Sequence, residues 1–527
     1  MLRALTSPRG MVTAPHHLAA QAGAGVLRDG GNAVEAMVAA AATIAVVYPH
    51  MNSIGGDGFW LISRPGQIPV GIDACGRAAG LATPAWYKKL GHAAIPSRGP
   101  LAANTVAGAV SGWQIALDRA GGRLPLARLL QDAIRYARDG APVTQSQVDY
   151  TGKFITELAP QPGFAPTFLR EGRPPQALSM QRFHALATTL DRLAQHGLDD
   201  FYRGDLARAM AAELERLGSP LRLDDLQRQC ASVVTPLSVD LSVGTVFNLP
   251  PPTQGLASLM ILALFDRIRA GAKENSFAHV HGLVEATKQA FKVRNRHICD
   301  PAAMTLNPGD CLRDAALDER ARAIVADRAQ PWPERGIKGD TVWMGAADSD
   351  GCMASYIQSV YWEFGAGVVL QDTGVNWQNR GASFSLDEAS HLVLVPGRKP
   401  FHTLNPALAR LSDGREMVYG NMGGDGQPQS QAAVFSRYAM FGRDLQAAVS
   451  APRWLLGRTW GEMSVSLKLE SRFEPALVAA LRDAGHDVDL IDPYSDLVGH
   501  AGALIRHPNS VLAGAADPRS DGAVAGL

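Results

Sequence analysis

The spacing of apolar side chains divides the chain into a helix-rich first part and a strand-rich second part. Residues 16–47 carry apolar side chains at helical spacing in two segments separated by a glycine pair, and Asn32 is a suitable N-cap for the second segment. Residues 53–64 and 69–77 instead alternate like two paired strands. Helical spacing returns in five later segments, at residues 108–120, 125–140, 180–197, 205–218 and 279–300.

Short alternating strands with tight turns predominate after residue 340. Two hairpins are predicted at residues 341–362 and 407–421, each around an Asp-Gly turn. Residues 392–397 and 487–492 add further strand signals. Just before this stranded part, residues 311–338 are charged, contain two prolines and lack a clear apolar period, so we expect an exposed, mobile segment there.

Length and charge limit the functions that the chain can have. Its 527 residues exceed one ordinary core and predict two to four units. The 50 basic and 50 acidic residues balance, which argues against a nucleic-acid partner and favours a small molecule or a protein. The most apolar run, at residues 36–47, is shorter than a bilayer span, so we predict a buried helix and no membrane partner.

The cysteines and the start of the chain indicate a cytoplasmic protein. The first 15 residues contain no apolar core of signal-peptide length. The five cysteines are widely spaced and form no CxxC pair, which favours reduced thiols over a disulfide framework or a zinc site. They are Cys75, Cys230, Cys299, Cys311 and Cys352.

Familiar catalytic and cofactor motifs are missing from the sequence. It contains no G-x-S-x-G elbow, no P-loop and no HExxH motif. His16 and His17 are adjacent and would point to different sides of a helix, which disfavours a shared metal ion. We therefore expect neither a metal nor another cofactor.

Thr341 begins the first predicted hairpin directly after Gly339-Asp340. A threonine hydroxyl is a poor nucleophile unless a base lies beside it. If the bond between Asp340 and Thr341 is cut, the new α-amine has a pKa near neutrality and can take the proton of its own hydroxyl. The residues alone leave a second interpretation open, in which Thr341 merely starts a strand.

Several dispersed segments, in a fixed order, resemble the γ-glutamyltranspeptidase family of N-terminal nucleophile hydrolases. They include "MVTAPHHLAAQAGAGVLRDGGNAVEAMV", "NLPPPTQGLASLMIL", "DSDGCMASYIQSVYWEFGAGVV", "GNMGGDGQPQSQAAVF", "DLQAAVSAPRW" and "GAADPRSDGAVAG". The resemblance implies an α/β (α+β) fold, a four-layer αββα sandwich with antiparallel sheets. It also implies self-cleavage at Asp340-Thr341 into a large subunit, residues 1–340, and a small subunit, residues 341–527, which intertwine as one catalytic unit.

The resemblance also assigns roles to three other residues. Gly423 and Gly424 match the glycine pair whose backbone N–H groups form the family's oxyanion hole, and bare backbone suits a close approach to a developing oxyanion. Ser359 matches a hydroxyl residue beside the nucleophile that assists processing. From the residues alone, the glycines could equally form a tight turn, and Ser359 could be a polar strand residue.

The chain departs from the family where a γ-glutamyl group would be recognised. Residues 379–384 read "NRGASF", so Arg380 and Ser383 replace an amide or acid and the aspartate that pairs with the substrate's α-amine. A cation at that place should strongly disfavour γ-glutamyl recognition. The family's paired serines read His402-Thr403.

Other replacements predict a small pocket for an anion. Trp343 and Tyr361 would narrow the pocket, since they share strand faces with Thr341 and Ser359. Arg380 can bind a carboxylate bidentately, and Arg77 is a second candidate. For both arginines a structural or surface ion pair is the alternative.

This pattern is most similar to the family's oxamate amidohydrolases of purine and allantoin breakdown. The expected reaction is hydrolysis of oxamate to oxalate and ammonia through an acyl-threonine ester. Two alternatives stay open within the family, a γ-glutamyltransferase or glutathione hydrolase and a β-lactam side-chain acylase. An unprocessed, non-catalytic relative that serves as a binding protein is an alternative from another class, and a higher homo-oligomer is also left open.

Overall fold

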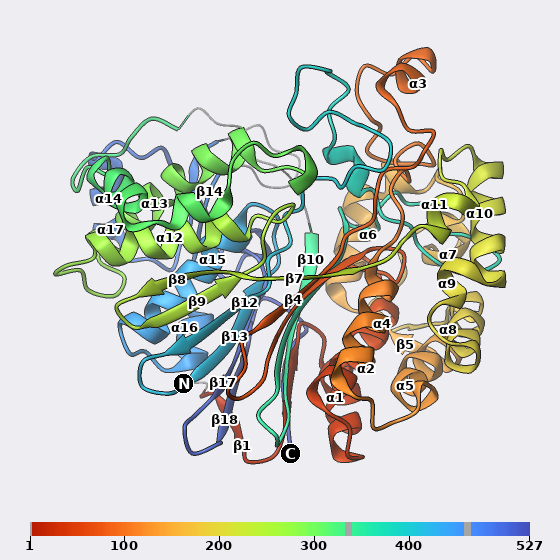
Figure 1. Cartoon of the computed structure of the whole chain (residues 1–527), viewed down its shortest axis with the longest axis horizontal. Coiled ribbons are helices and arrows are strands. Elements are labelled where there is room, and N and C mark those ends of the chain that lie inside the picture. Colours follow the sequence, from red (N-terminus) through yellow and green to blue (C-terminus); the bar gives the residue numbers. More distant parts are fainter. Residues whose placement is uncertain (1–2, 333–339, 458–464) are drawn as a thin grey trace.

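The computed structural model describes residues 3–332, 340–457 and 465–527. Within these residues the chain forms two seven-stranded antiparallel sheets that lie face to face, with helices on both outer faces (Figure 1). The layer order is helix, sheet, sheet, helix, so the predicted αββα sandwich is confirmed. From the length of the chain we expected two to four units. The described residues instead form one sandwich with two large hydrophobic cores, each between one sheet and the helices that cover it.

One sheet contains the strands that end near Gly423 and Gly424. Its strands, in spatial order, are β1 (Leu5–Ser7), β18 (Leu512–Ala516), β17 (Ala501–Arg506), β13 (Glu416–Asn421), β12 (Ala407–Leu411), β9 (Gly244–Asn248) and β8 (Leu237–Leu241). All neighbouring pairs are antiparallel.

The other sheet contains the strand that begins at the Asp340-Thr341 junction. Its order is β19 (Ala523–Gly526), β2 (Met11–Ala14), β10 (Asp340–Ala347), β11 (Met353–Tyr361), β3 (Asp57–Ser63), β4 (Val70–Ala74) and β7 (Ser232–Val234). Strands from before and after residue 340 are therefore interleaved in each sheet. The division into subunits at residue 340 stays a prediction.

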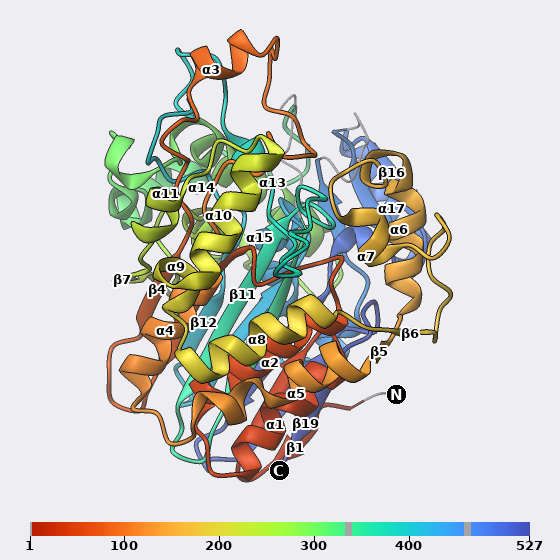
Figure 2. The ribbon, with the colours of Figure 1, turned by 90° about the vertical axis from the view of Figure 1, so that its right-hand side faces the viewer.

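Helices cover the two outer faces in separate groups. The sheet of β10 is covered by α1 (His17–Arg28), α2 (Ala33–Val47) and α4 (Ala109–Ala120), with α5 (Leu126–Asp139) and α8 (His184–His196) outside them (Figure 2). The sheet of β13 is covered by α12 (Gly255–Ile268), α15 (Gly426–Phe435) and α16 (Leu445–Ser450), and α13 (Phe277–His297) and α17 (Pro475–Asp483) lie further out.

The remaining elements are short or peripheral. The helices are α3 (Pro84–Lys89), α6 (Gln145–Leu158), α7 (Phe164–Phe168), α9 (Asp200–Arg203), α10 (Asp205–Leu217), α11 (Leu223–Gln227) and α14 (Asp314–Arg322). Two small sheets contain β14 (Trp454–Leu456), β15 (Leu467–Glu470) and β16 (Val488–Ile491), and β5 (Ala141–Pro142) and β6 (Met180–Gln181).

The helix start predicted at Asn32 is confirmed in detail. The Asn32 side chain accepts hydrogen bonds from Val34 N and Glu35 N, and Glu35 Oε2 accepts one from Asn32 N at 2.8 Å, which completes a capping box. Every residue of α2 is buried because the helix lies between the sheet and α5. Among the described residues, no helix combines the length and the apolar character that a membrane crossing requires.

Three parts of the strand and loop prediction were wrong. The predicted loop at 311–338 contains helix α14, whose Leu317 and Ala321 are buried; residues 333–338 lie outside the described residues. Two apolar residues one turn apart are too few to reveal a helix in a charged segment.

Residues 392–397, which were predicted as a strand, do not form one. Leu394 is buried, Val395 is exposed, and Pro396-Gly397 follows. The alanine- and glycine-rich strands β17 to β19 were not predicted because those residues have little strand preference.

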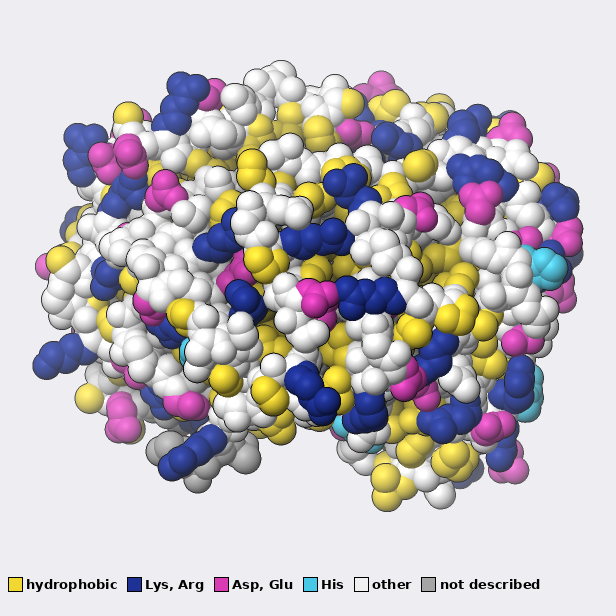
Figure 3. All heavy atoms as spheres, turned by 60° about the horizontal axis from the view of Figure 1, so that its bottom comes forward, with side chains coloured by type: hydrophobic (Ala, Val, Ile, Leu, Met, Phe, Trp, Pro, Cys, Tyr) yellow, Lys and Arg dark blue, Asp and Glu magenta, His cyan; other side chains and the backbone are white. Residues whose placement is uncertain are grey.

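The molecular surface agrees with the balanced charge. Figure 3 shows lysine and arginine side chains interspersed with acidic ones across one face, without a broad region of one sign. All five cysteines are free thiols.

Candidate active site

Thr341 lies at the end of the sandwich and between its two sheets. It is 1% exposed and follows the first residue of β10. The register between β10 and β11 shifts at this point, because Asp340 pairs with Tyr361 whereas Val342 pairs with Gln358. The Thr341 hydroxyl approaches the opposite sheet, since Gln427 Nε2 of α15 lies 3.5 Å from Thr341 Oγ1. Thr341 thus meets a side chain from the helix that follows β13 of the other sheet.

The turn between β13 and α15 contains Gly423 and Gly424 and leads directly into Gln427, whose side chain reaches Thr341. The φ angles of the two glycines are +111° and +52°, a region that L side chains rarely adopt, which explains two consecutive glycines. The turn is closed by hydrogen bonds from Gly426 N to Gly423 O and from Gln427 N to Gly424 O. Among the described residues, neither Gly423 N–H nor Gly424 N–H has a protein acceptor. The oxyanion-hole role of these two N–H groups stays a prediction.

Arg380 is a buried cation with unused hydrogen-bonding capacity. Its side chain is 0% exposed, its Cζ lies 3.7 Å from the centre of the Tyr361 ring, and its Nη2 donates to Thr403 Oγ1 at 3.3 Å. Within the described residues, Arg380 Nε and Nη1 have no partner. Burial lowers the pKa of Arg380 to about 10, so the guanidinium stays charged at neutral pH. Because Tyr361 is opposite Asp340 across the strands, this charge lies close to the predicted cleavage junction.

His402 and Asp57 form a buried pair on the other side of the arginine. His402 Nε2 lies 3.0 Å from Asp57 Oδ2, and Asp57 also accepts hydrogen bonds from Gly76 N, Gly108 N and Gln378 Nε2. Burial raises the pKa of Asp57 to about 6, although the hydrogen bonds and the Arg380 charge oppose the shift. Burial also lowers the pKa of His402 well below 6.5, so the imidazole is neutral and donates to Asp57 from Nε2.

Gln254 connects the glycine turn to the Arg380 region. Its Nε2 donates to Thr403 O at 2.7 Å and to Gly424 O at 2.8 Å. Its Oε1 accepts from Arg294 Nη1 at 2.8 Å, and Arg294 also forms a buried ion pair with Asp425. Hydrogen bonds therefore run continuously from Thr341 through Gln427, the glycine turn, Gln254 and Thr403 to Arg380.

The sequence did not identify Asp57, Gln254, Arg294 and Gln427 as site residues. Gln254 and Gln427 lie within segments that resemble the family, but an amide side chain carries no chemical signature of its own. Asp57 follows a glycine pair at the start of a strand, which was a usable signal. Arg294 gave none, because it is one of several basic residues at the end of a long helix.

Trp343 and Ser359 lie on the strands that flank Thr341. The Trp343 ring lies between the sheets, where a Cβ at Gly420 or Gly502 would come within 2.0 or 2.5 Å of it, and its Nε1 donates to Ser355 Oγ at 2.9 Å. Ser359 Oγ accepts from Tyr361 N at 2.8 Å. Trp343 thus fills the core just behind Thr341, and its influence on pocket size stays a prediction, as do the roles of the other site residues.

Arg77 does not join this group. It is exposed, and its Nη1 donates to Gly397 O at 3.0 Å. It lines a separate cavity of about 520 Å³ together with the Asp73–Lys399 ion pair.

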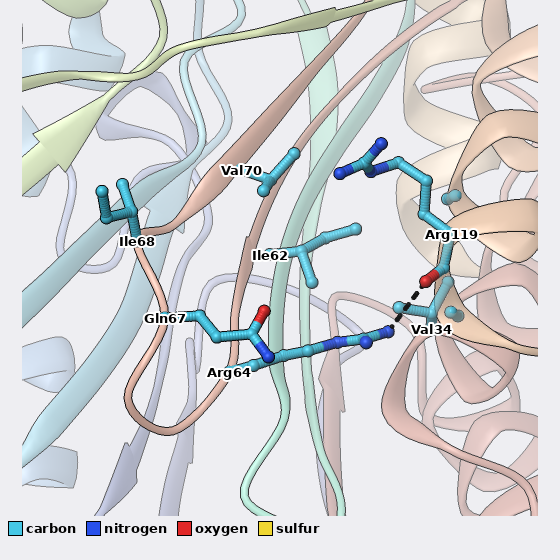
Figure 4. Close-up of a pocket in the computed structure, with 9 residues that line it drawn as sticks. Val34, Ile62, Arg64, Gln67, Ile68, Val70 and Arg119 are labelled. Atoms are coloured by element: carbon cyan, nitrogen blue, oxygen red, sulfur yellow. Dashed lines mark hydrogen bonds between the residues drawn. The ribbon is translucent and has the colours of Figure 1, made fainter.

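Another cavity lies at the far end of the same sheet. Its lining includes Ile62, Arg64, Val70 and Arg119, and Arg64 Nη2 donates to Arg119 O at 3.1 Å (Figure 4). Because Ser63 pairs with Met353 and Asp57 with Ser359, this cavity is a whole strand length away from Thr341. It does not take part in the candidate site.

Two buried groups in the described chain have the composition of a metal site. Asp57, Cys75 and His402 form one, and His281, Glu285 and His486 form the other. A cation already lies beside each, since Arg380 neighbours the first and Lys288 Nζ lies 2.6 Å from Glu285 Oε1 in the second. Neither arrangement favours a second positive charge.

Comparisons with known proteins agree on one family. The sequence model of gamma-glutamyltranspeptidase matches residues 19–527. The chain is 55% identical over 524 residues to the oxamate amidohydrolase proenzyme of Klebsiella pneumoniae subsp. pneumoniae, covering 99% of each. It is 39% identical over 531 residues to the glutathione hydrolase-like YwrD proenzyme of Bacillus subtilis, covering 100% of each. Its structure is similar to the crystal structure of cephalosporin acylase from Bacillus halodurans, with a TM-score of 0.91 at 32% identity and coverage of 100% of this chain and 97% of that one.

Proposed function

The chain belongs to the γ-glutamyltranspeptidase family of N-terminal nucleophile hydrolases, and from this premise we propose that it cleaves itself before Thr341 and then hydrolyses a small anionic amide. Oxamate is the proposed substrate. The position of Thr341 between the two sheets, beside Gln427 and the glycine turn, supports a nucleophile there. Its relatives are named as proenzymes, which supports a precursor that is cut in two.

Self-cleavage converts one peptide bond into a new chain end. Thr341 Oγ attacks the carbonyl carbon of Asp340, the C–N bond breaks, and the hydroxyl proton passes to the freed amine of Thr341. Water then hydrolyses the resulting ester, which leaves a carboxylate on Asp340 and restores the threonine hydroxyl. The free α-amine is thereby produced on the residue whose hydroxyl it must activate.

Amide hydrolysis uses the same groups in a second cycle. The amine takes the hydroxyl proton as Oγ attacks the substrate amide, and it returns the proton to the leaving ammonia. The N–H groups of Gly423 and Gly424 stabilise the tetrahedral oxyanion. Water then attacks the acyl-threonine ester, releasing the acid and restoring the enzyme.

The observation that carries the substrate class is the unused capacity of Arg380. A buried guanidinium with two nitrogens that lack acceptors in the described part of the chain, held in place by Tyr361 and Thr403, is suited to receive a carboxylate. Oxamate joins a carboxylate directly to an amide, so that a single cation close to Thr341 can hold one end while the threonine attacks the other. The 55% identical relative named for this substrate supports the choice.

A γ-glutamyl substrate would carry an α-ammonium group into the same region. In this chain the charge there is positive, and Ser383, which replaces the family's aspartate, donates its hydroxyl to Phe401 O at 3.3 Å. We therefore place γ-glutamyl transfer second. Acylase activity on β-lactam side chains is a further alternative, favoured by the similarity to cephalosporin acylase.

Two measurements test the proposal. Denaturing electrophoresis of mature protein should show two bands that sum to the full chain, and Thr341→Ala should remain one band. The cleaved enzyme should release ammonia from oxamate faster than from malonamate or succinamate, and it should release little nitroanilide from a γ-glutamyl nitroanilide. A single full-length band from active wild-type protein would rule out the mechanism, and preference for the γ-glutamyl substrate would replace oxamate by the first alternative.

We also propose that the enzyme acts in the cytoplasm, where its five free cysteines would stay reduced. Fractionation of cells that produce the protein would test this location.

A further inference from the structure

A second buried cluster lies outside the candidate active site and holds the chain just before the cleavage junction. It consists of His281, Glu285, Lys288 and Gln289 of α13 together with His486, which follows α17; we call these five residues the linker clamp. Their side chains are all buried. The chain that they hold, residues 325–332, is here called the anchored segment.

The clamp contacts the anchored segment at two residues, Gln330 and Val325. At Gln330, Lys288 Nζ donates to the backbone O at 2.6 Å, and the backbone N donates to the Glu285 carboxylate at 3.3 Å. Gln289 Nε2 donates to Gln330 Oε1 at 3.1 Å. At Val325, the backbone O accepts a hydrogen bond from His281 Nε2 at 2.8 Å.

Proton positions in the histidine pair follow from this last contact. A carbonyl oxygen can only accept, so His281 carries its proton on Nε2 and its Nδ1 accepts from His486 Nε2 at 2.8 Å. Burial, followed by the nearby Lys288 charge and His281, lowers the pKa of His486 to about 3. His486 therefore stays neutral throughout the physiological pH range.

Helix α13 connects the clamp to the glycine turn of the active site. Arg294, on the same helix, holds Asp425 and Gln254, and Gln254 in turn holds Gly424 O. Glu285 and Arg294 are nine residues apart, about 13 Å along a helix. Between them, the ring of Phe291 lies 6.2 Å from the ring of Trp332 in the anchored segment. One rigid helix thus fixes the distance between the anchored segment and the predicted oxyanion hole.

From these contacts we propose that the linker clamp positions the chain for self-cleavage before Thr341; the inference rests on the proposed function. Ten residues separate Gln330 from Thr341 in the sequence. With Gln330 held by the clamp and Asp340 held by strand pairing with Tyr361, the scissile carbonyl samples fewer positions relative to Thr341 Oγ and the glycine turn. Fixing both ends raises the fraction of molecules that are ready to react.

The alternative is that the cluster only joins α13 to the α17 region. Ala329 N donates to Ala484 O at 2.8 Å, and His486 follows closely, so such a structural role has contacts of its own. The two roles make different predictions. A purely structural role lowers the melting temperature and leaves the cleavage rate of folded precursor unchanged, whereas a positioning role slows cleavage.

The test uses the double variant Glu285→Gln/Lys288→Met, which removes both charges and so leaves no buried charge unpaired. Freshly synthesised full-length precursor is followed by denaturing electrophoresis, and we expect cleavage to be about tenfold slower than in the wild type. Once cleaved, the variant should hydrolyse oxamate with wild-type kcat/KM, because the clamp does not touch substrate. The matched control is Asp132→Asn/Arg135→Met, which removes an ion pair of the same spacing on α5 and should cleave at the wild-type rate.

Each outcome has a defined meaning. Wild-type cleavage kinetics in the folded double variant would overturn the positioning role. If that variant does not fold, Gln289→Leu, which removes a single clamp contact, decides the matter: cleavage about threefold slower supports the role and an unchanged rate overturns it. Failure of the wild-type precursor to cleave on the same gel would instead refute the proposed function itself.

Discussion

Arg294 and Arg380 are both buried with their guanidinium groups over an aromatic ring, yet the protein uses their hydrogen-bonding capacity very differently. Arg294 lies over Phe291 and donates to Asn295, Gln254 and Asp425 from all three of its nitrogens. Arg380 lies over Tyr361 and, among the residues that the structure describes, donates once, to Thr403. Because a buried unpaired cation is costly to a fold, the second arrangement supports the proposal that Arg380 receives an anionic ligand.

The comparison separates a framework region from a ligand region within one site. The framework, around Arg294, has an internal partner for its charge and sets the position of the glycine turn. In the ligand region, around Arg380, the countercharge found among the described residues is Asp57, which acts on Arg380 at a distance and is paired with His402. Mutations in the first region should therefore change stability, and mutations in the second should change substrate affinity.

The largest expected effect is on the framework side. Arg294→Met would remove the buried ion pair between Arg294 and Asp425, and we expect a loss of about 3–5 kcal/mol in the free energy of unfolding. Urea denaturation of the mature enzyme measures this directly. The charge-free control Arg294→Met/Asp425→Asn should recover most of the stability; if the single and double variants are equally stable, the ion pair is not what holds the framework.

Replacing Arg380, the cation of the ligand region, should reduce activity on oxamate and leave the stability of the protein intact. Arg380→Met should lower kcat/KM for oxamate by about 2–4 kcal/mol of transition-state binding, or roughly 30- to 1000-fold, because the substrate carboxylate loses its partner. The urea midpoint should stay the same or rise, since the variant no longer buries an unpaired charge. Steady-state kinetics and denaturation of the same preparation check both halves, and a large fall in stability would place Arg380 in the framework instead.

Part of the fold and part of the candidate site could be predicted from the sequence. The helices and the two hairpins follow from apolar periods and Asp-Gly turns, whereas the αββα layers, and the choice of Thr341, Gly423 and Gly424 over other interpretations, came from the resemblance to the family. Arg380 could be noticed as a cation where the family has none. What the sequence could not show is that Arg77 faces away while Gln254 and Arg294 face inward, because that depends on how segments far apart in the sequence pack together.

The third expected effect is on pH dependence in the ligand region. With a pKa of about 6, Asp57 is neutral at pH 5 and negatively charged at pH 8. Its negative charge opposes binding of an anion at Arg380, so KM for oxamate should be roughly threefold to tenfold lower at pH 5 than at pH 8. Asp57→Asn should lack this inflection near pH 6, and its persistence in that variant would assign it to another group, such as the Thr341 amine.

The raised pKa of Asp57 also makes the stability of the folded protein depend on pH. The pKa of Asp57 is raised from 3.8 in the unfolded chain, so between about pH 4 and 6 the native state binds more protons than the unfolded state. The stability contributed by this group is therefore present below pH 4 and is lost as the pH rises through 6. In the framework region, Arg294→Met/Asp425→Asn should leave this part of the stability profile unchanged, whereas Asp57→Asn should flatten it.

The last expected effect concerns the ring beneath Arg380. Tyr361 holds the guanidinium by a cation–π contact at 3.7 Å, and in a desolvated site such a contact contributes about 1–2 kcal/mol. Tyr361→Leu keeps an apolar side chain but removes the ring face, so Arg380 should become less well positioned and KM for oxamate should rise roughly fivefold to thirtyfold with little change in kcat. Tyr361→Phe is the matched control, because it keeps the ring and should retain wild-type KM. If the phenylalanine variant is as impaired as the leucine variant, the hydroxyl of Tyr361 contacts the substrate, and the ligand region would then contain a second polar anchor besides Arg380.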